Sequence, residues 1–227
     1  MQQDLCTIPI ADVFAPKDGC PICSLYTMLE ERALDFVMGA AMMEPEIRLL
    51  TNAQGFCTTH YQKMLSMNNR LSLALMLESH LDTVQQAVQV KKGRADACAQ
   101  LVSGCYVCNV IRSNLSRMIL NVYKTFTRDL DFRRLVAEQP YYCLPHYTML
   151  QSGIKGHLSK KDAEAFSDAI TEVENRALTQ LRADVHSFCG LYDYRAQKEE
   201  ATPQIKQAIE RTIAYLTAKP MPGDVKL

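Results

Sequence analysis

The chain contains the same four-residue ligand pattern twice, and this duplication constrains its fold more than any other feature. A CxxC pair followed by a CxxH pair occurs once in each half, as Cys20, Cys23, Cys57 and His60, then Cys105, Cys108, Cys143 and His146. The pairs are separated by 34 positions from Cys23 to Cys57 and by 35 positions from Cys108 to Cys143. Two cysteines flanking two residues can bind one metal ion, and a second pair completes a tetrahedron. The sequence therefore predicts two metal sites, each with three Cys ligands and one His ligand.

Agreement between the two copies extends beyond the ligands. The matched positions are Gly19 and Gly104, Arg32 and Arg117, Val37 and Val122, Arg48-Leu49 and Arg134-Leu135, and Tyr61 and Tyr147. Such agreement indicates duplication of a whole supersecondary unit rather than of a ligand motif alone. We expect a first metal-binding helical repeat over residues 1–93 and a second over 94–190. A C-terminal extension with a helix, packed on the same globule, is expected over 191–227.

Apolar side chains recur every three to four residues after each CxxC pair, which indicates helices. Further helices are expected over residues 45–51, 71–90, 131–138, 160–185 and 203–216. Ser159 is a candidate N-cap for the helix that begins at residue 160. No run of alternating β-branched residues indicates a strand. The predicted fold class is all-α, with two pseudo-repeated helical units, each stapled by a CxxC…CxxH metal site, and additional C-terminal helices.

Each ligand pair is expected at a helix N-terminus, where backbone N–H groups and the helix dipole stabilise thiolate charge. The segment between the pairs is long enough to close each site within one copy. The same spacing also permits ligand pairs to be exchanged between the copies. Arg48 and Arg134 lie at equivalent points, nine residues before Cys57 and Cys143. They are candidates either for cations beside the sulfurs or for an exposed helical face.

Three thiolates and one imidazole favour structural zinc, with two ions per chain and all ligands supplied by protein. An iron–sulfur cluster is the main alternative, although the spacing does not match the CxxCxxC runs of ferredoxins. A redox dithiol at Cys20 and Cys23 is a weaker alternative, because it is expected on a βαβ scaffold. Buried free thiols are the simplest interpretation of Cys6, Cys98 and Cys189, which have no motif partner.

Composition narrows the class of protein further. A disulfide framework is disfavoured because 227 residues, 48% of them hydrophobic, can bury a core without one. The first residues lack the basic and apolar regions of a secretory leader, and no apolar stretch is long enough to span a bilayer. We therefore expect a cytoplasmic protein without membrane association. Lys and Arg total 25 and Asp and Glu total 25, so the clustered positive charge of nucleic-acid-binding proteins is not expected.

No catalytic signature is evident: the chain contains no GxSxG motif, phosphate-binding glycine loop or dinucleotide fingerprint. We therefore lean against an enzyme and predict no catalytic residues. Seven of the eleven Met residues lie between positions 28 and 76. They either fill the core or form an adaptable helix-binding surface. The favoured function is a metal-stabilised binding or adaptor module whose partner is another protein, and the alternative is an iron–sulfur redox or electron-transfer protein.

Three phrases of the sequence are distinctive, namely CPICSL at 20–25, GFCTTH at 55–60 and Asp193-Tyr194-Arg195. With them the chain resembles a family of uncharacterised helical proteins from anaerobic and Gram-positive bacteria. Members carry a CPxCxL…GFCxxH unit, a second CxxC…CxxH and a terminal DYR segment followed by one helix. The resemblance covers nearly the full chain, although Pro140-Tyr141-Tyr142 replaces the usual Gly and aromatic residue in the second copy. It implies the helical fold and the metal sites, and it implies no activity.

Overall fold

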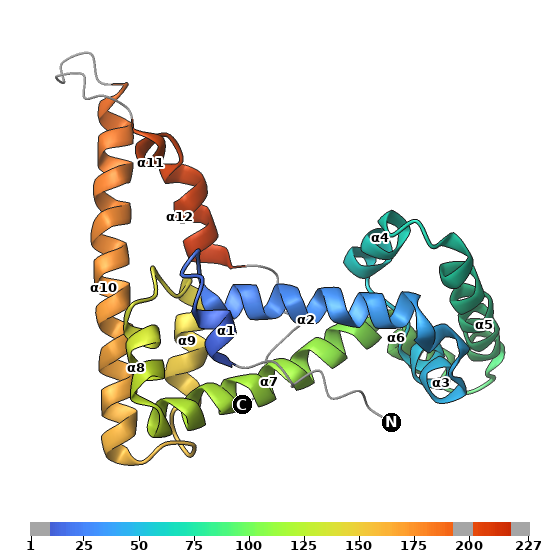
Figure 1. Cartoon of the computed structure of the whole chain (residues 1–227). Coiled ribbons are helices and arrows are strands. Elements are labelled where there is room, and N and C mark those ends of the chain that lie inside the picture. The colour runs from blue at the N-terminus through green and yellow to red at the C-terminus, as the bar shows by residue number, and fades with distance from the viewer. Residues whose placement is uncertain (1–9, 193–201, 219–227) are drawn as a thin grey trace. The chain divides into compact units, whose positions relative to one another are not determined.

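The computed structural model describes residues 10–192 and 202–218, and these form α-helices and one short 3-10 helix (Figure 1). No strand occurs within the two described ranges, so the predicted all-α fold class is confirmed. Two features singled out in the sequence, Cys6 and the Asp193-Tyr194-Arg195 phrase, lie outside the described residues.

The described elements are twelve α-helices and the 3-10 helix η1. In chain order they are α1 (Ile10–Phe14), α2 (Pro21–Met38), η1 (Ala40–Met43), α3 (Pro45–Gln54), α4 (Thr58–Ser66), α5 (Arg70–Gln89), α6 (Arg94–Ser103), α7 (Tyr106–Arg128), α8 (Leu130–Ala137), α9 (Leu144–Gly153), α10 (Lys160–Gly190), α11 (Pro203–Lys206) and α12 (Ala208–Thr217). The helices expected over 45–51, 71–90, 131–138 and 160–185 correspond to α3, α5, α8 and α10. The helix expected over 203–216 is divided into α11 and α12. Neither α1 nor α6 was predicted, and α6 has no buried residue that would produce an apolar periodicity.

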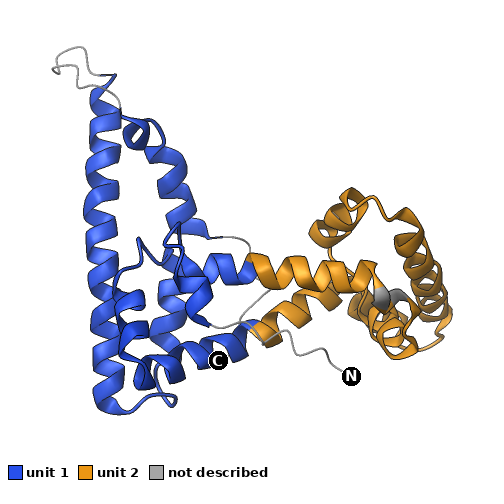
Figure 2. Cartoon of the chain, in the orientation of Figure 1, with its two compact units in different colours: residues 1–26, 115–227 blue, residues 27–114 orange. Residues whose placement is uncertain are grey.

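The chain divides into two compact units (Figure 2). Unit 1 comprises residues 1–26 and 115–227, and unit 2 comprises residues 27–114. The boundaries between them fall inside α2 and α7 rather than at residue 93, where the two sequence repeats are expected to meet. Each unit therefore contains segments from both repeats.

Unit 1 is built on α10, the long helix that contacts α8, α11 and α12. The side chain of Ser159 accepts a hydrogen bond from the backbone N–H of Asp162, as expected for an N-cap. Phe166 of α10 packs edge-on against Tyr123 and Phe126 of α7, with ring centroids 5.3 and 4.9 Å apart. These contacts attach α7 to α10, because buried aromatic rings contribute large apolar areas to a core.

Unit 2 is centred on mutual contacts among α3, α5 and α6. Three of its Met residues, Met38, Met64 and Met76, are buried, and Met28 and Met67 are partly buried. Core filling is therefore the role of these three side chains, and they form no exposed binding surface. Met43, by contrast, is exposed.

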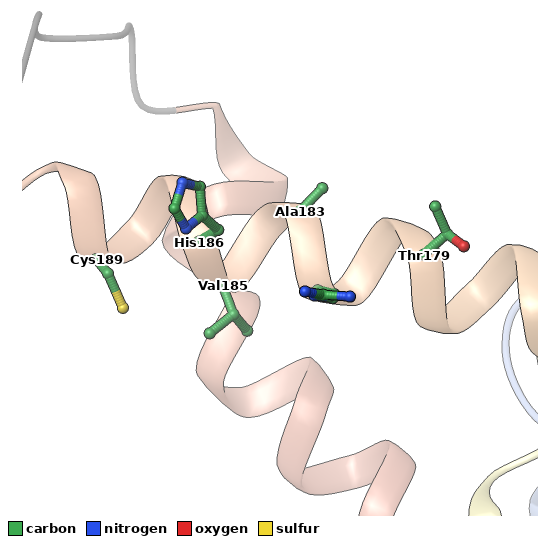
Figure 3. A pocket seen from close by; sticks show the side chains of 6 residues that line it. Thr179, Ala183, Val185, His186 and Cys189 are labelled. Carbon is green, nitrogen blue, oxygen red and sulfur yellow. The ribbon is translucent and has the colours of Figure 1, made fainter.

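The two cysteines without motif partners that the structure describes are not deeply buried. Cys98 is partly buried and Cys189 is exposed, so the expectation of a buried thiol is wrong for Cys189. Cys189 lines a pocket with five other residues of α10, namely Thr179, Arg182, Ala183, Val185 and His186 (Figure 3).

Candidate metal centres

The eight motif residues form two groups of four, each confined to one unit. Cluster 1, in unit 1, contains Cys20, Cys23, Cys143 and His146, and cluster 2, in unit 2, contains Cys57, His60, Cys105 and Cys108. Within each cluster the four candidate ligand atoms all lie within 4.8 Å of one another. Each cluster therefore combines the CxxC pair of one copy with the CxxH pair of the other. The expectation that each site closes within one copy is wrong, and the exchanged arrangement is the one observed.

All four ligand pairs occupy the same local structure, the first turn of a helix. The first Cys of each pair lies just before its helix, and its carbonyl oxygen accepts a hydrogen bond from the N–H four residues later, in Ser24, Tyr61, Asn109 and Tyr147. Residues three apart then project from the same face of the turn. The predicted location at helix N-termini is confirmed, and the free N–H groups there favour thiolate charge.

Cluster 1 is largely enclosed. Cys20, Cys143 and His146 are buried, and only Cys23 is partly exposed. The Nδ1 atom of His146 lies 2.9 Å from the sulfur of Cys143, 3.4 Å from that of Cys23 and 3.5 Å from that of Cys20. The sulfurs of Cys23 and Cys143 are 3.6 Å apart. The imidazole therefore directs one nitrogen toward all three sulfurs.

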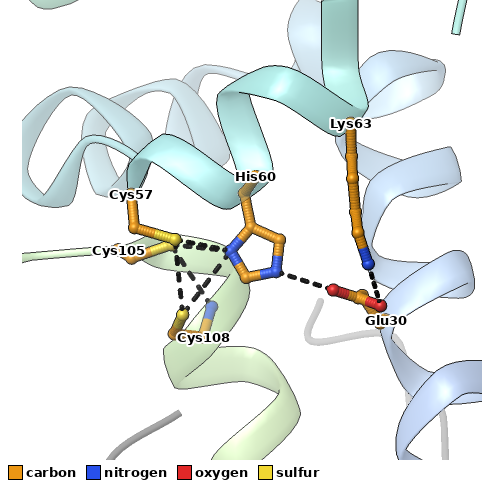
Figure 4. Close-up of polar contacts among 6 residues, drawn as sticks. All are labelled: Glu30, Cys57, His60, Lys63, Cys105 and Cys108. Carbon is orange, nitrogen blue, oxygen red and sulfur yellow. Dashed lines mark hydrogen bonds and ion pairs between the residues drawn. The ribbon is translucent and has the colours of Figure 1, made fainter. Parts of the chain in front are cut away.

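Cluster 2 has the same arrangement (Figure 4), and two of its cysteines rather than one are partly exposed. The Nδ1 atom of His60 lies 3.1 Å from the sulfur of Cys57, 3.2 Å from that of Cys105 and 3.5 Å from that of Cys108. The sulfurs of Cys57 and Cys108 are 3.9 Å apart. Cys57 and Cys108 are partly exposed, whereas Cys105 and His60 are buried.

These separations are close to the edges of a single-ion tetrahedron or somewhat shorter. Bond lengths of about 2.3 Å to sulfur and about 2.0 Å to nitrogen place tetrahedral ligands about 3.8 Å apart for two sulfurs and about 3.5 Å apart for sulfur and nitrogen. The sulfur–sulfur distances of 3.6 and 3.9 Å lie close to the first value. The sulfur–nitrogen distances range from 2.9 to 3.5 Å in cluster 1 and from 3.1 to 3.5 Å in cluster 2. The residues present thus fit one tetrahedral ion in each cluster.

Close packing of the thiols lowers the pKa of some of them and raises the pKa of others. A hydrogen bond from Cys143 lowers the pKa of Cys23, and a hydrogen bond from Cys108 lowers the pKa of Cys105 to about 3. Burial raises the pKa of Cys20, and the hydrogen bond to Cys105 raises the pKa of Cys108. One thiol in each cluster is therefore readily ionised. A cation at the centre would favour ionisation of the others, because the thiolate is the metal-binding form of cysteine.

A close backbone contact brings the two halves of cluster 2 together. The N–H of Tyr106 donates a hydrogen bond of 3.0 Å to the carbonyl oxygen of Gly55. A Cβ atom on Gly104 would lie 2.3 Å from the carbonyl oxygen of Gln54, so only glycine permits this approach. Gly55 itself has a φ of 58°, a conformation that favours glycine. These glycines place the segment before Cys57 against the segment before Cys105.

A buried carboxylate supports the corresponding segment of cluster 1. Glu174 of α10 accepts hydrogen bonds from the backbone N–H of Tyr142 and from the hydroxyl of Tyr215, at 2.7 and 2.6 Å. Burial raises the pKa of Glu174. Tyr142 immediately precedes Cys143, so this contact positions the start of α9, which carries Cys143 and His146.

Sequence reasoning missed a second carboxylate, which lies beside cluster 2. Glu30 of α2 is buried, and its Oε1 atom lies 3.2 Å from the Nε2 atom of His60 (Figure 4). Its other oxygen forms an ion pair with Lys63 of α4. The signal in the sequence was a charged residue within the apolar stripe of the helix, four residues after Tyr26 and three before Ala33, both of which are buried.

The paired arginines do not have equivalent roles. Arg48 donates hydrogen bonds to the carbonyl oxygen of Leu75 and to the hydroxyl of Ser79, which attach α3 to α5. The Arg134 side chain is 75% exposed and pairs with Asp131 on the same helix. The exposed-face interpretation is therefore correct for Arg134, and the contacts of Arg48 give it a role in packing two helices together.

Comparison with known proteins identifies the family and assigns no activity. The model of a family described as "Family of unknown function (DUF6062)" matches residues 1–222. The chain belongs to this family. A search of curated proteins found no match, and a search of solved structures found none. In the part of the chain that the structure describes, no helix is both long and apolar enough to cross a membrane.

Proposed function

We propose that each cluster binds one zinc ion and that the protein is a helical module held together by two structural metal sites. The observation that carries this proposal is the arrangement of four protein donors, all within 4.8 Å of one another, in each cluster. Four protein ligands complete the tetrahedral coordination of zinc. No position is left for a water molecule or a substrate, so the ion supports the fold rather than chemistry at the metal.

The compactness of the clusters favours a single ion over an iron–sulfur cluster. In an iron–sulfur cluster the four protein ligands are divided between two or more irons, which are bridged by inorganic sulfide. Ligands on different irons must stand further apart than ligands on one ion. All four ligand atoms of each cluster instead lie within 4.8 Å of one another, as ligands of one ion do.

Elemental analysis of protein purified without added metal tests this function. We expect about two zinc ions per chain, one for each ligand set, and no visible colour. Replacement of zinc by Co²⁺ should then give the absorption of tetrahedral cobalt with thiolate ligands. Iron and acid-labile sulfide with absorption near 400 nm would instead establish the electron-transfer alternative, and protein that folds without metal would contradict both.

The thiols also support a proposed location. We infer that the protein is bacterial, as the resemblance in its sequence implies, and that it is cytoplasmic. All eight cysteines in the described residues are free, and reduced thiols are typical of the cytoplasm. We further infer that the chain arose by duplication of one unit, with repeats at 1–93 and 94–190 and an extension at 191–227.

The proposed role of the module is to bind another protein. One face of α12 exposes Ile209, Ile213 and Leu216, at the three- and four-residue spacing of a helical stripe. Another side of α12 is buried through Ala208 and Tyr215. Equal totals of 25 basic and 25 acidic residues favour a protein over a nucleic acid as the partner.

Cross-linking in the native host tests this role with a matched pair of variants. Ile213→Asp places a charge in the stripe, and Leu130→Asp places one on an exposed Leu of α8. A true partner should be enriched with the wild type and with Leu130→Asp but lost with Ile213→Asp, at unchanged zinc content and melting temperature. Equal recovery with both variants would exclude the stripe as the binding surface.

A further inference from the structure

Glu30 is a buried charge that the packing of unit 2 does not by itself require. Its relative exposure is 6%, and it lies on the buried side of α2 near Leu29 and Ala33. An unpaired carboxylate in such a place would be strongly destabilising. Glu30 is instead paired on both oxygens, with His60 on one and Lys63 on the other. All of these residues belong to unit 2.

The contact with His60 determines which ring nitrogen is available to a metal ion. A carboxylate oxygen 3.2 Å from Nε2 accepts a hydrogen bond from that nitrogen. In the neutral ring the other nitrogen, Nδ1, then carries a lone pair, and Nδ1 is the atom directed at the three sulfurs of cluster 2. Hydrogen bonding of a ligand histidine to a carboxylate fixes the ring orientation and increases its basicity as a ligand.

The second copy of the repeat carries a different residue at this position. Cys20 and Cys105 are offset by 85 positions, and the same offset matches Glu30 with Leu115. Leu115 is fully buried, so an apolar side chain is compatible with this helix position. The carboxylate is therefore a property of the first copy and is not demanded by the repeated helical framework.

We propose that Glu30 is a positioning residue for a divalent metal ion in cluster 2, acting by holding His60 in the Nε2–H tautomer with Nδ1 directed at the ion. The inference rests on the proposed function, since it concerns the metal that cluster 2 binds. Lys63 pairs with the second carboxylate oxygen, so that Glu30 adds no net negative charge to that of the three thiolates. Glu30 thus acts on the metal through His60 and does not contact the ion.

Two substitutions at Glu30 and one control separate this role from simple packing. Glu30→Leu introduces the residue that the second copy carries, and Glu30→Gln keeps an acceptor oxygen without the charge. The matched control is Glu31→Gln, because Glu31 is the next residue of the same helix and is exposed. Competition with a chelator measures the zinc affinity of each cluster. Cys57→Ser removes a ligand of cluster 2 and Cys143→Ser removes a ligand of cluster 1, so the binding transition lost in each variant is assigned to that cluster. The tautomer of His60 is read from the nitrogen chemical shifts of its imidazole.

The expected result is a loss confined to cluster 2. Glu30→Leu should weaken zinc binding there by about 10- to 100-fold, the usual effect of removing a carboxylate partner of a ligand histidine. Glu30→Gln should produce a smaller loss, and cluster 1 and Glu31→Gln should match the wild type. The Nε2–H tautomer of His60 should predominate in the wild type and should be retained less fully in Glu30→Leu.

Each alternative result has a definite meaning. If Glu30→Leu lowers the melting temperature while cluster 2 keeps its affinity and His60 keeps its tautomer, Glu30 is only a packing residue and the inference fails. If Glu30→Leu does not fold, the test depends on Glu30→Gln. The inference is then overturned if cluster 2 of Glu30→Gln binds zinc as tightly as cluster 2 of the wild type. Wild-type protein that binds no metal would instead refute the proposed function itself.

Discussion

Gly104 lies so close to Gln54 that a Cβ atom on the glycine would be 2.3 Å from the Gln54 carbonyl oxygen. The obstructing atom belongs to the backbone, so it cannot turn aside as the end of a side chain can. This contact lies between the segments that lead into Cys57 and Cys105. Their separation in cluster 2 therefore depends on the absence of a side chain at position 104.

We expect Gly104→Ala to separate the two halves of cluster 2 and to reduce zinc content from about two ions per chain to about one. The matched control is Gly19→Ala, at the equivalent position before Cys20. A Cβ atom there would lie 3.8 Å from the Tyr141 hydroxyl, an ordinary contact, so the control should bind both ions. Elemental analysis and thermal melting measure the two effects. Full zinc content in Gly104→Ala would show that the backbone relaxes without affecting the site.

The exchange of ligand pairs predicts which thiols become reactive when one ligand is lost. Cys143→Ser should expose Cys20 and Cys23 to alkylation, because these complete cluster 1, and should leave Cys105 and Cys108 protected. Cys57→Ser should have the opposite pattern. Mass spectrometry after brief alkylation of folded protein measures the protection of each cysteine. Exposure of Cys105 and Cys108 in Cys143→Ser would indicate sites closed within each copy.

The local structure of the sites was predictable because it depends on short-range sequence. Apolar periodicity identified most of the long helices, and the i, i+3 spacing of each motif placed its ligands on one face of a helical turn. Ser159 was identified as an N-cap from its position alone and accepts the expected hydrogen bond from Asp162.

The pairing of the motifs was not predictable, because the two CxxH pairs are chemically equivalent partners for either CxxC pair. The choice is made by tertiary contacts such as the Tyr106–Gly55 hydrogen bond, which joins residues 51 positions apart. The contact of Glu30 with His60 was not predictable for a related reason. A single charged residue in a helix becomes significant only when the fold brings it to His60, and its sequence separation of 30 positions gives no indication of that contact.

We expect the titration of Glu174 to make the free energy of unfolding depend on pH, and its burial sets the direction of that dependence. Burial raises the pKa of this carboxyl group, so the folded state binds its proton more tightly than the unfolded state does. The favourable contribution of the group is complete below its ordinary pKa and is lost as pH rises from that value through the raised pKa. We therefore expect the free energy of unfolding of the wild type, relative to Glu174→Gln, to fall as pH rises through this window.

Urea unfolding at several pH values measures this difference, and the subtraction removes titrations that the two proteins share. Glu174→Leu is the informative control, because it leaves the N–H of Tyr142 and the hydroxyl of Tyr215 without their acceptor. It should cost about 1–3 kcal/mol relative to Glu174→Gln at every pH, as expected for unsatisfied buried polar groups. A difference between wild type and Glu174→Gln that rises with pH would contradict the assignment.

The number of independent structural sites can be counted from the dependence of stability on free zinc. An ion that binds only the folded state adds about 1.4 kcal/mol to the free energy of unfolding for each tenfold increase in its free concentration above the Kd. Two independent clusters should therefore give a slope of about 2.8 kcal/mol per decade, twice the single-site value. Cys57→Ser and Cys143→Ser should each halve the slope, whereas Cys189→Ser, an exposed thiol outside both clusters, should leave it unchanged. Denaturant unfolding in zinc buffers provides the measurement, and a wild-type slope equal to that of either ligand variant would show that only one cluster binds an ion.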